Sequence, residues 1–183
     1  MTATAKHVAL LRGTNVGGAN RLPMAGLAAL FEEAGCSDVR TYIQSGNVVF
    51  AADAGVADGL GGRIAGAIAE RYGLRVPVVL RTAGEMSEAA RRNPFVEAGA
   101  DEKALHVAFL ADEPSPRAVA SLDADRSPPD RFAVLGREVY LHLPNGVGRS
   151  KLTNAYLDAR LGTVSTLRNW RTVLTLLGMA TAR

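Results

Sequence analysis

Residues 7–11, HVALL, recur almost unchanged at residues 106–110 as HVAFL. Each segment is a short apolar run of the kind that forms a buried β-strand. Five residues are weak evidence of a duplication by themselves. The duplication therefore depends on whether the same elements follow each copy along the chain.

The first copy is followed by the pattern of a βαββαβ unit. Pro23 suits the first turn of a helix, Gly35 suits its end, and SGN at residues 45–47 is a hairpin signal. In chain order the sequence predicts a strand at 7–11, a helix at 23–36, strands at 38–44 and 47–52, a helix at 60–73, a strand at 74–82 and an added helix at 83–93. This order is that of the ferredoxin-like fold.

The second copy predicts the same order with a weaker end. The segments are a strand at 105–111, a short helix after 113–117, strands at 131–136 and 138–144, a helix at 150–162, a final strand reduced to 163–166 or absent, and an extra C-terminal helix at 166–179. We therefore expect an α+β fold made by tandem duplication of a ferredoxin-like unit. The expected subdomains are 1–93 and 103–183, joined by a connector at 94–102. One continuous mixed sheet built from both halves is the alternative.

Composition places the chain among globular proteins and excludes several kinds of site. Of 183 residues, 48% are hydrophobic and 21% charged, and no apolar stretch approaches the roughly 18 residues of a membrane helix. Cys36 is the only cysteine, so an intrachain disulfide and a four-cysteine zinc site are excluded. The N-terminus has no secretory signal, and we expect a cytoplasmic protein.

Positive charge is concentrated at the two ends of the chain. Residues 1–27 carry a net charge of +3 and residues 145–183 carry +5, whereas the middle of the chain carries −5. If the two ends meet in space, they form a region that attracts anions; if they point apart, they do not.

The loop after the first strand, RGTNVGGANR at residues 12–21, is the candidate functional site. In the predicted topology the first and second strands run parallel, and the third runs in the opposite direction and lies beside the first in the middle of the sheet. The end of the first strand, the start of the first helix and the QSGN turn at 44–47 then lie at one edge. A helix start attracts anions, glycines allow close approach of the backbone, and arginines bind phosphate or carboxylate. The candidate ligand-binding residues here are Arg12, Asn15, Gly17, Gly18, Asn20, Ser45, Gly46 and Asn47. The alternative is that glycine and asparagine only make turns, and that Arg12 pairs with an acid.

A second basic patch follows at residues 143–150, LPNGVGRS. The segment resembles a P-loop, but Leu143 stands where the first glycine belongs and Arg149 replaces the lysine. We therefore interpret Arg149 and Lys151 as a basic patch, with a turn carrying solvated charges as the alternative. Near the C-terminus, Arg168 and Asn169 fall in the expected first turn of the last helix, where a cation opposes the dipole and suggests an anionic neighbour. Helical spacing places Trp170, Val173, Leu174 and Leu177 on one expected buried stripe, with Trp170 as a core anchor.

The residue pattern does not indicate a metal site, a catalytic nucleophile or an RNA recognition module. The histidines lie on predicted strands without metal-ligand spacing, Cys36 has no identifiable base, and Ser45 lacks a nucleophile elbow. No metal site is predicted, and no cofactor is identified. The third strand lacks the aromatic pattern of the RNA recognition module, although other nucleic-acid binding stays open.

Several motifs together resemble a known family. LLRGTNVGGANRLPM, DVRTYIQSGNVVF, NPF, SKL and TLRNWRTV, spread over residues 7–179, are similar to the bacterial domain-of-unknown-function family 1697. The resemblance implies a duplicated α+β fold and a cytoplasmic bacterial protein, and it implies no activity. Its recurring motifs include Arg168 and Asn169 as well as the loop residues already selected.

The leading hypothesis is a protein that binds a small anionic or phosphorylated ligand at the edge formed by residues 12–20 and 44–47. An enzyme acting on a phosphorylated or carboxylated substrate at the same edge is one alternative. A structural or protein-interaction domain without a small ligand is the other. The sequence leaves the reaction, the ligand and the oligomeric state open.

Overall fold

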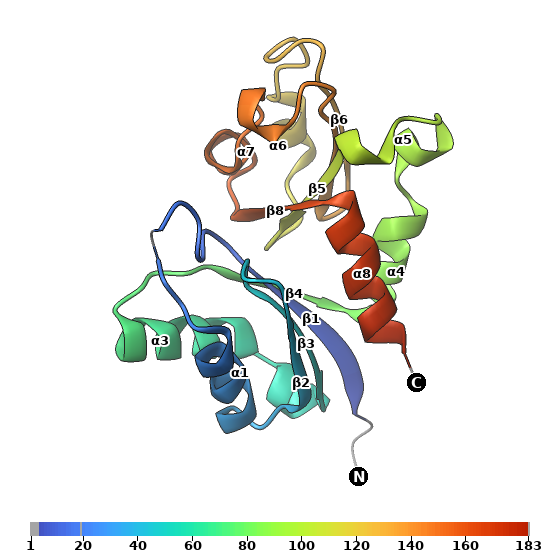
Figure 1. Ribbon diagram of the computed structural model, residues 1–183. Helices are drawn as coiled ribbons and strands as arrows, with labels where there is room; N and C mark the ends of the chain where they lie inside the picture. The colour runs from blue at the N-terminus through green and yellow to red at the C-terminus, as the bar shows by residue number, and fades with distance from the viewer. Residues whose placement is uncertain (1–3, 19, 183) are drawn as a thin grey trace. The chain divides into compact units, whose positions relative to one another are not determined.

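The computed structural model describes residues 4–18 and 20–182, which fold into two compact units. The first unit comprises residues 1–87 with 175–183, and the second comprises residues 88–174. Each unit contains one four-stranded antiparallel sheet, so the fold is α+β and the alternative of one continuous sheet is wrong (Figure 1). Among the residues that the structure describes, no helix is both long and apolar enough to cross a bilayer.

The first unit has the strand order β2-β3-β1-β4. Its elements are β1 (Ala5–Leu11), α1 (Met24–Glu33), β2 (Ser37–Tyr42), β3 (Asn47–Ala52), α2 (Ala54–Ala57), α3 (Leu60–Tyr72), β4 (Val78–Thr82) and the start of α4 (Ala83–Arg91). β1 pairs antiparallel with β3 and with β4, and β3 pairs antiparallel with β2. β1 and β2 therefore run in the same direction, as the sequence predicts.

The core of the first unit lies between the sheet and two helices, α1 and α3, which cover the same face (Figure 1). Leu60, Ile64 and Ile68 recur every four residues and give α3 one apolar face. Leu27 and Phe31 do the same for α1, and Phe31 packs against Phe50 of β3 with ring centroids 5.0 Å apart. This packing fixes the position at which α1 begins relative to the sheet.

The second unit repeats this strand order as β6-β7-β5-β8. Its elements are α5 (Pro94–Glu97), a 3-10 turn η1 (Glu102–Ala104), β5 (Leu105–Leu110), α6 (Pro116–Ala120), β6 (Arg131–Leu135), β7 (Glu138–His142), a 3-10 turn η2 (Val147–Arg149), α7 (Asn154–Leu161), β8 (Ser165–Asn169) and the start of α8 (Trp170–Thr181). The expected connector at 94–102 thus contains α5 and the start of η1.

The last strand of the second unit corrects the sequence-based expectation. β8 is not reduced or absent: it has five residues, as β4 does, and pairs with β5 from Ser165 to Asn169. Ser165 and Thr166 therefore lie in a strand and do not cap the last helix. The prediction failed because the helical spacing of residues 170–177 extends backwards over TLRN, which has no glycine or proline to mark a boundary.

The two units differ most in the loop after their first strand. Residues 12–23 connect β1 to α1, whereas residues 111–115 connect β5 to α6, which is twelve residues against five. The position of each loop is otherwise the same, because Leu11 N donates to Gly46 O at 2.9 Å and Leu110 N donates to Arg137 O at 2.8 Å. The longer loop is the one that carries the candidate site.

Candidate functional site

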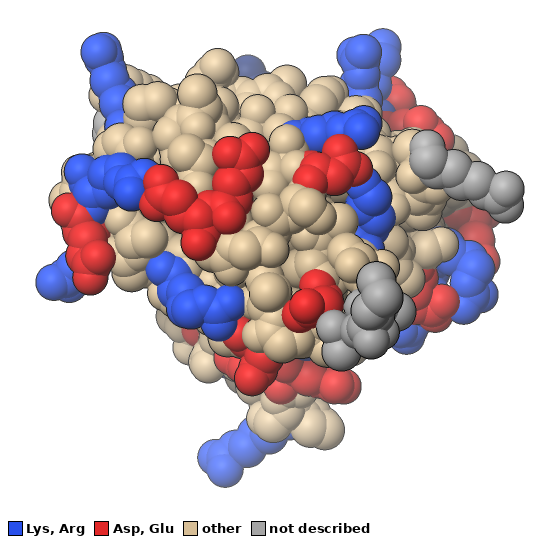
Figure 2. All heavy atoms as spheres, turned by 90° about the horizontal axis from the view of Figure 1, so that it is seen from below, with Lys and Arg blue, Asp and Glu red and all other residues tan. Residues whose placement is uncertain are grey.

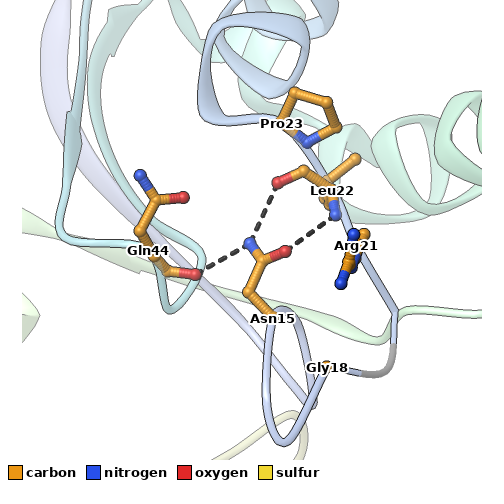
Figure 3. A pocket seen from close by; sticks show the side chains of 6 residues that line it. All are labelled: Asn15, Gly18, Arg21, Leu22, Pro23 and Gln44. Atoms are coloured by element: carbon orange, nitrogen blue, oxygen red, sulfur yellow. Dashed lines mark hydrogen bonds between the residues drawn. The ribbon is translucent and has the colours of Figure 1, made fainter.

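The loop at residues 12–23 and the turn at residues 43–46 form one surface of the first unit (Figure 3). Besides the bond from Leu11 N to Gly46 O, the side chain of Asn15 donates to Gln44 O at 2.8 Å. The prediction that these two segments are neighbours is therefore confirmed. Their contact follows from β1 and β3 pairing side by side, because one segment ends β1 and the other begins β3.

Asn15 is the centre of this surface. Its Nδ2 donates to Leu22 O at 2.9 Å as well as to Gln44 O, and its Oδ1 accepts from Leu22 N at 2.9 Å. Both amide hydrogens are thus bonded to protein carbonyls. Asn15 also has φ of 54°, a left-handed conformation that asparagine tolerates better than most residues. Its amide joins both sides of the loop to the hairpin turn, so it holds the site in shape.

The other asparagines of the site close turns as well. Asn20 donates to Gly13 O at 3.0 Å, and the buried Asn47 donates to Tyr42 O at 3.2 Å and to Ser45 Oγ at 3.0 Å. These bonds set the shape of the loop and the hairpin. A direct ligand contact by these side chains remains a prediction.

Two kinds of glycine occur at this edge. Gly46 has φ of 72°, and a Cβ there would lie 2.6 Å from Thr14 Oγ1 and 2.7 Å from Leu11 Cβ, so the hairpin contact requires glycine. Gly17 and Gly18 also have positive φ, but a Cβ on either would meet no atom within 4 Å. Gly46 therefore serves packing, whereas Gly17 and Gly18 leave open space along the loop.

A pocket of about 420 Å³ lies beside the loop, lined by Asn15, Gly18, Arg21, Leu22, Pro23 and Gln44. Pro23 is the residue before α1, and no side chain caps this helix end among the described residues. The first turn of α1 contains no acidic residue, and its first backbone bond is Leu27 N to Pro23 O at 2.9 Å. The backbone N–H groups of residues 24–26 thus precede the first bonded turn. The helix end adjoining the pocket is electropositive.

Arg21 and Arg12 occupy different environments at this edge. Arg21 is exposed and lines the pocket, on the far side of Leu22 from the hairpin turn (Figure 3). Arg12 is half-buried, and its backbone N–H donates to Pro77 O at 3.1 Å. Four residues that line the pocket were not among the predicted site residues: Arg21, Leu22, Pro23 and Gln44. Their signal in the sequence is position alone, since each lies close to a predicted residue along the chain.

Two large apolar side chains are exposed on the same two segments. Val16 is 64% exposed and Ile43 is 52% exposed. Ile43 also has φ of 50°, which is strained for a β-branched residue. The pocket therefore lies between segments that carry both polar and apolar surface.

The remaining predicted site residues belong to the second unit. Arg149 ends η2 and Lys151 follows it, and both are exposed. Arg168 lies on β8, not in a helix, and its Nη1 donates to Thr166 Oγ1 at 2.7 Å and to Leu167 O at 2.8 Å. Burial lowers the pKa of Arg168 to about 10. Asn169 precedes α8, and its Oδ1 accepts from Thr172 N at 2.8 Å. Its side chain therefore caps that helix, so the expected helical position of both residues is wrong.

The thiol and two of the histidines are buried to different degrees. Burial raises the pKa of Cys36, which keeps the thiol protonated and unreactive. Burial also lowers the pKa of His7 and of His106. In the part of the chain that the structure describes, no three His, Cys, Asp or Glu side chains gather as metal ligands.

Some surface charges of the first unit form ion pairs. Asp38 contacts both Lys6 and Arg40, and Glu33 contacts Arg71 at 2.8 Å. The hydrogen bond from Lys6, then that from Arg40, lowers the pKa of Asp38, and the bond from Arg71 lowers the pKa of Glu33. Cationic and anionic side chains accordingly alternate over the face shown in Figure 2.

Comparison with known proteins places the chain in a family. Its fold is similar to that of a conserved bacterial protein, SP0830 from Streptococcus pneumoniae, with a TM-score of 0.73 and 21% sequence identity over 98% of this chain and 100% of that one. No curated protein matches the chain. The family model matches residues 4–140, whereas the motifs indicated a resemblance as far as residue 179. Because that match covers most of the chain, the protein belongs to the DUF1697 family, described as a protein of unknown function.

Proposed function

We propose that the first unit binds a small anionic or phosphorylated ligand in the pocket beside residues 15–23. The observation that carries the proposal is the start of α1, which adjoins the pocket with no side-chain cap and no acidic residue in its first turn. A helix start of this kind favours negative charge, typically by 0.3–1 kcal/mol when it is exposed and by up to about 2 kcal/mol when it is partly buried.

Arg21 supplies the formal charge that the helix end lacks. Its guanidinium is exposed on the pocket wall, and a planar fork of N–H donors matches two oxygens of a phosphate or carboxylate. Arg12 is a second candidate cation at the same edge. Arg168 and Asn169 belong to the second unit, where each has the structural contacts described above, and ligand binding by them is a separate prediction that this pocket does not include.

The loop is rigid enough to favour binding without a large ordering cost. Asn15 holds it through three hydrogen bonds, and Asn20 closes it through a fourth, from its Nδ2 to Gly13 O. A ligand that enters a preformed site loses less of its binding free energy to ordering the protein. We therefore place the specificity in Arg21 and the backbone, and assign the asparagines to support.

Thermal unfolding in the presence of phosphate or a nucleotide tests this proposal. A ligand at a hundred times its Kd stabilises the folded protein by about 2.7 kcal/mol. For a chain of this size that raises Tm by roughly 5–10 °C. Arg21→Gln should remove most of this increase and leave Tm without ligand within about 1 °C.

Arg117→Gln is the matched control. Arg117 is exposed on α6 of the second unit, and its substitution changes the net charge by the same amount as Arg21→Gln. The ligand-dependent rise in Tm of this variant should therefore equal that of the wild type. Equal losses in both variants would show that only overall charge matters and would remove the pocket from the proposal.

Protein docking at the same edge is the second candidate. It is supported by the exposure of Val16 and Ile43, because large apolar side chains at an edge of this kind favour a contact with another apolar surface. A Val16→Ser/Ile43→Ser double variant should then lose a partner without losing any phosphate-dependent rise in Tm. The ligand proposal expects the reverse pattern for Arg21→Gln.

The proposal also includes the finer description of the fold and of the location. Each unit is interpreted as a ferredoxin-like repeat, supported by the shared strand order and the shared bond from the end of the first strand to the hairpin turn. A cytoplasmic location is supported by the single, buried Cys36, which suits a reducing compartment.

A further inference from the structure

The loop at residues 121–130 of the second unit is fastened to the segment before α7. Lys151 N donates to Ser127 Oγ at 3.0 Å, and Arg126 Nε donates to Lys151 O at 3.0 Å. Ser127 is buried and donates to Asp130 Oδ2 at 2.7 Å, so its hydroxyl has a fixed orientation. Arg126 and Lys151 are thereby held beside each other although they are 25 positions apart in the sequence.

Arg126 is also fixed by an aromatic ring. Its Cζ lies 3.9 Å from the centre of the Tyr156 ring, which is close for a cation–π contact. Tyr156 is buried, and its hydroxyl accepts from Asp123 N at 2.9 Å. The Cζ of Arg160 lies 5.7 Å from the centre of the same ring. One face of the Arg126 guanidinium is therefore covered and its Nε is bonded, whereas neither Nη group has a hydrogen-bond partner among the described residues.

The basic residues of this loop and of residues 149–160 form no ion pair in the part of the chain that the structure describes. Within residues 4–18 and 20–182, no carboxylate oxygen lies within 4.0 Å of Arg126, Arg149, Lys151 or Arg160. The exposed acids of the same loop are Asp123 and Asp125, and Asp123 Oδ1 accepts from Asp125 N at 2.9 Å. Asp130, the third acid of the loop, accepts from Ser127, so none of the loop's three carboxylates pairs with these cations, which leaves the cations to pair with an added anion.

We infer that Arg126 and Lys151, with Arg149 and Arg160, bind the phosphate group of a phosphomonoester at a second site. The two Nη groups of Arg126 form a preoriented fork for two phosphate oxygens, and Lys151 supplies a point charge for the second negative charge. A carboxylate has a single charge and is satisfied by the arginine alone, so the pair favours a dianion. This site is independent of the pocket in the first unit.

Nuclear magnetic resonance of the full chain tests the inference directly. The Nε–H signal of Arg126 is followed while inorganic phosphate, glycerol phosphate or acetate is added at constant ionic strength. The signal should shift and saturate with inorganic phosphate and with glycerol phosphate, and it should respond to acetate with a Kd about tenfold higher. A response to inorganic phosphate but not to glycerol phosphate identifies free phosphate as the ligand and excludes a phosphomonoester.

The Kd for phosphate in variants distinguishes binding by the oriented Arg126 side chain from attraction by the net positive charge of the protein. Arg126→Lys retains the charge and loses both the Nε bond and the fork, so we expect Kd for phosphate to rise about tenfold, as measured from the shifts of the Arg149 and Arg160 Nε–H signals. Arg117→Gln removes a charge from the same unit and should change Kd less than about twofold. Arg21→Gln should leave Kd unchanged, which distinguishes failure of this site from failure of the pocket in the first unit.

Three results would overturn the inference. A wild-type response that grows linearly without saturation indicates non-specific screening. Equal weakening by Arg126→Lys and Arg117→Gln indicates that only net charge matters. Equal affinity for acetate and phosphate removes the role assigned to Lys151.

Discussion

At the residue scale, the side chains that the sequence marks most clearly serve to hold the site together. Asn15 bonds three backbone atoms from two segments, and Gly46 allows the hairpin turn to approach Thr14 and Leu11. Arg21, an exposed residue of the same loop that was not among the predicted site residues, lines the pocket. Substitutions can therefore separate support of the loop from contact with a ligand.

Asn15→Asp should destabilise the protein more than Asn15→Ala. Alanine leaves Leu22 N and two carbonyls without their partner, at a cost of about 2 kcal/mol; aspartate also turns a negative oxygen toward Leu22 O and Gln44 O, raising the cost to about 3 kcal/mol or more. Denaturant unfolding measures both values. A smaller loss for aspartate would mean that the amide hydrogens contribute little.

Gly46→Ala should cost about 2–4 kcal/mol. The loss combines a left-handed backbone, which costs an L-residue roughly 1–2 kcal/mol, with overpacking against Thr14 and Leu11. Gly17→Ala has the same kind of φ but no close neighbour, so it should cost only about 1 kcal/mol. Similar losses in the two variants would show that packing at Gly46 is unimportant.

At the scale of elements, each last strand runs directly into a capped helix. Thr82 ends β4, and its Oγ1 accepts from Glu85 N at 3.1 Å at the start of α4. Asn169 ends β8 and caps α8 in the same way. Arg81 and Arg168 precede these caps, both are buried, and each donates from Nη1 to the carbonyl of the residue before it. The two units therefore match in a second pair of segments besides HVALL and HVAFL, namely LRT at residues 80–82 and LRN at residues 167–169.

Asn169→Ala should destabilise the second unit by about 1 kcal/mol, the usual loss for a helix N-cap. Asn169→Ser should restore most of it, because serine also accepts at this position. Thermal unfolding and hydrogen exchange at Thr172 report the loss. If exchange at Thr172 stays as slow in Asn169→Ala as in the wild type, the cap is not what protects that amide.

The residue pattern predicted the order of elements and their neighbours because turn signals and helical spacing are local. It placed the loop beside the hairpin turn because connectivity alone requires this. It failed at residues 165–169 and at Leu174, which is 40% exposed although helical spacing put it on the buried stripe. Strand pairing and the face that a helix buries depend on distant residues. Arg126 and Tyr156 could not be paired in advance for the same reason, since their contact joins a loop to α7.

At the scale of the whole molecule, four groups make stability depend on pH in one direction. Burial lowers the pKa of His7 and of His106 below 6.5, and ion pairs lower those of Glu33 and Asp38. In each case the unfolded chain binds more protons than the folded chain just below the unfolded pKa. Stability therefore falls as the pH falls.

The free energy of unfolding should decrease as the pH falls from about 6.5, because the unfolded chain then binds protons at His7 and His106 that the folded chain does not bind. It should decrease again below about 4.5, as the paired carboxylates are protonated. Because Glu33 and Asp38 are exposed, their share is small and declines in salt. A His7→Gln/His106→Gln variant should flatten the slope between pH 6.5 and pH 5, as measured by denaturant unfolding. An unchanged slope in this variant would assign the first decrease to other groups.

The connection after the first strand is longer in the first unit (residues 12–23) than in the second (residues 111–115), so the second unit shows the same fold without the long loop. In both units the end of the first strand bonds the hairpin turn through the same backbone hydrogen bond. This arrangement therefore forms with a five-residue connection to the next helix. Grafting residues 111–115 in place of residues 12–21, which keeps the buried Leu22, should therefore give a chain that folds and has no pocket at this edge. The long loop therefore adds a pocket to a strand-to-hairpin connection that five residues complete in the second unit, and it does so with left-handed backbone at Asn15 and Asn20.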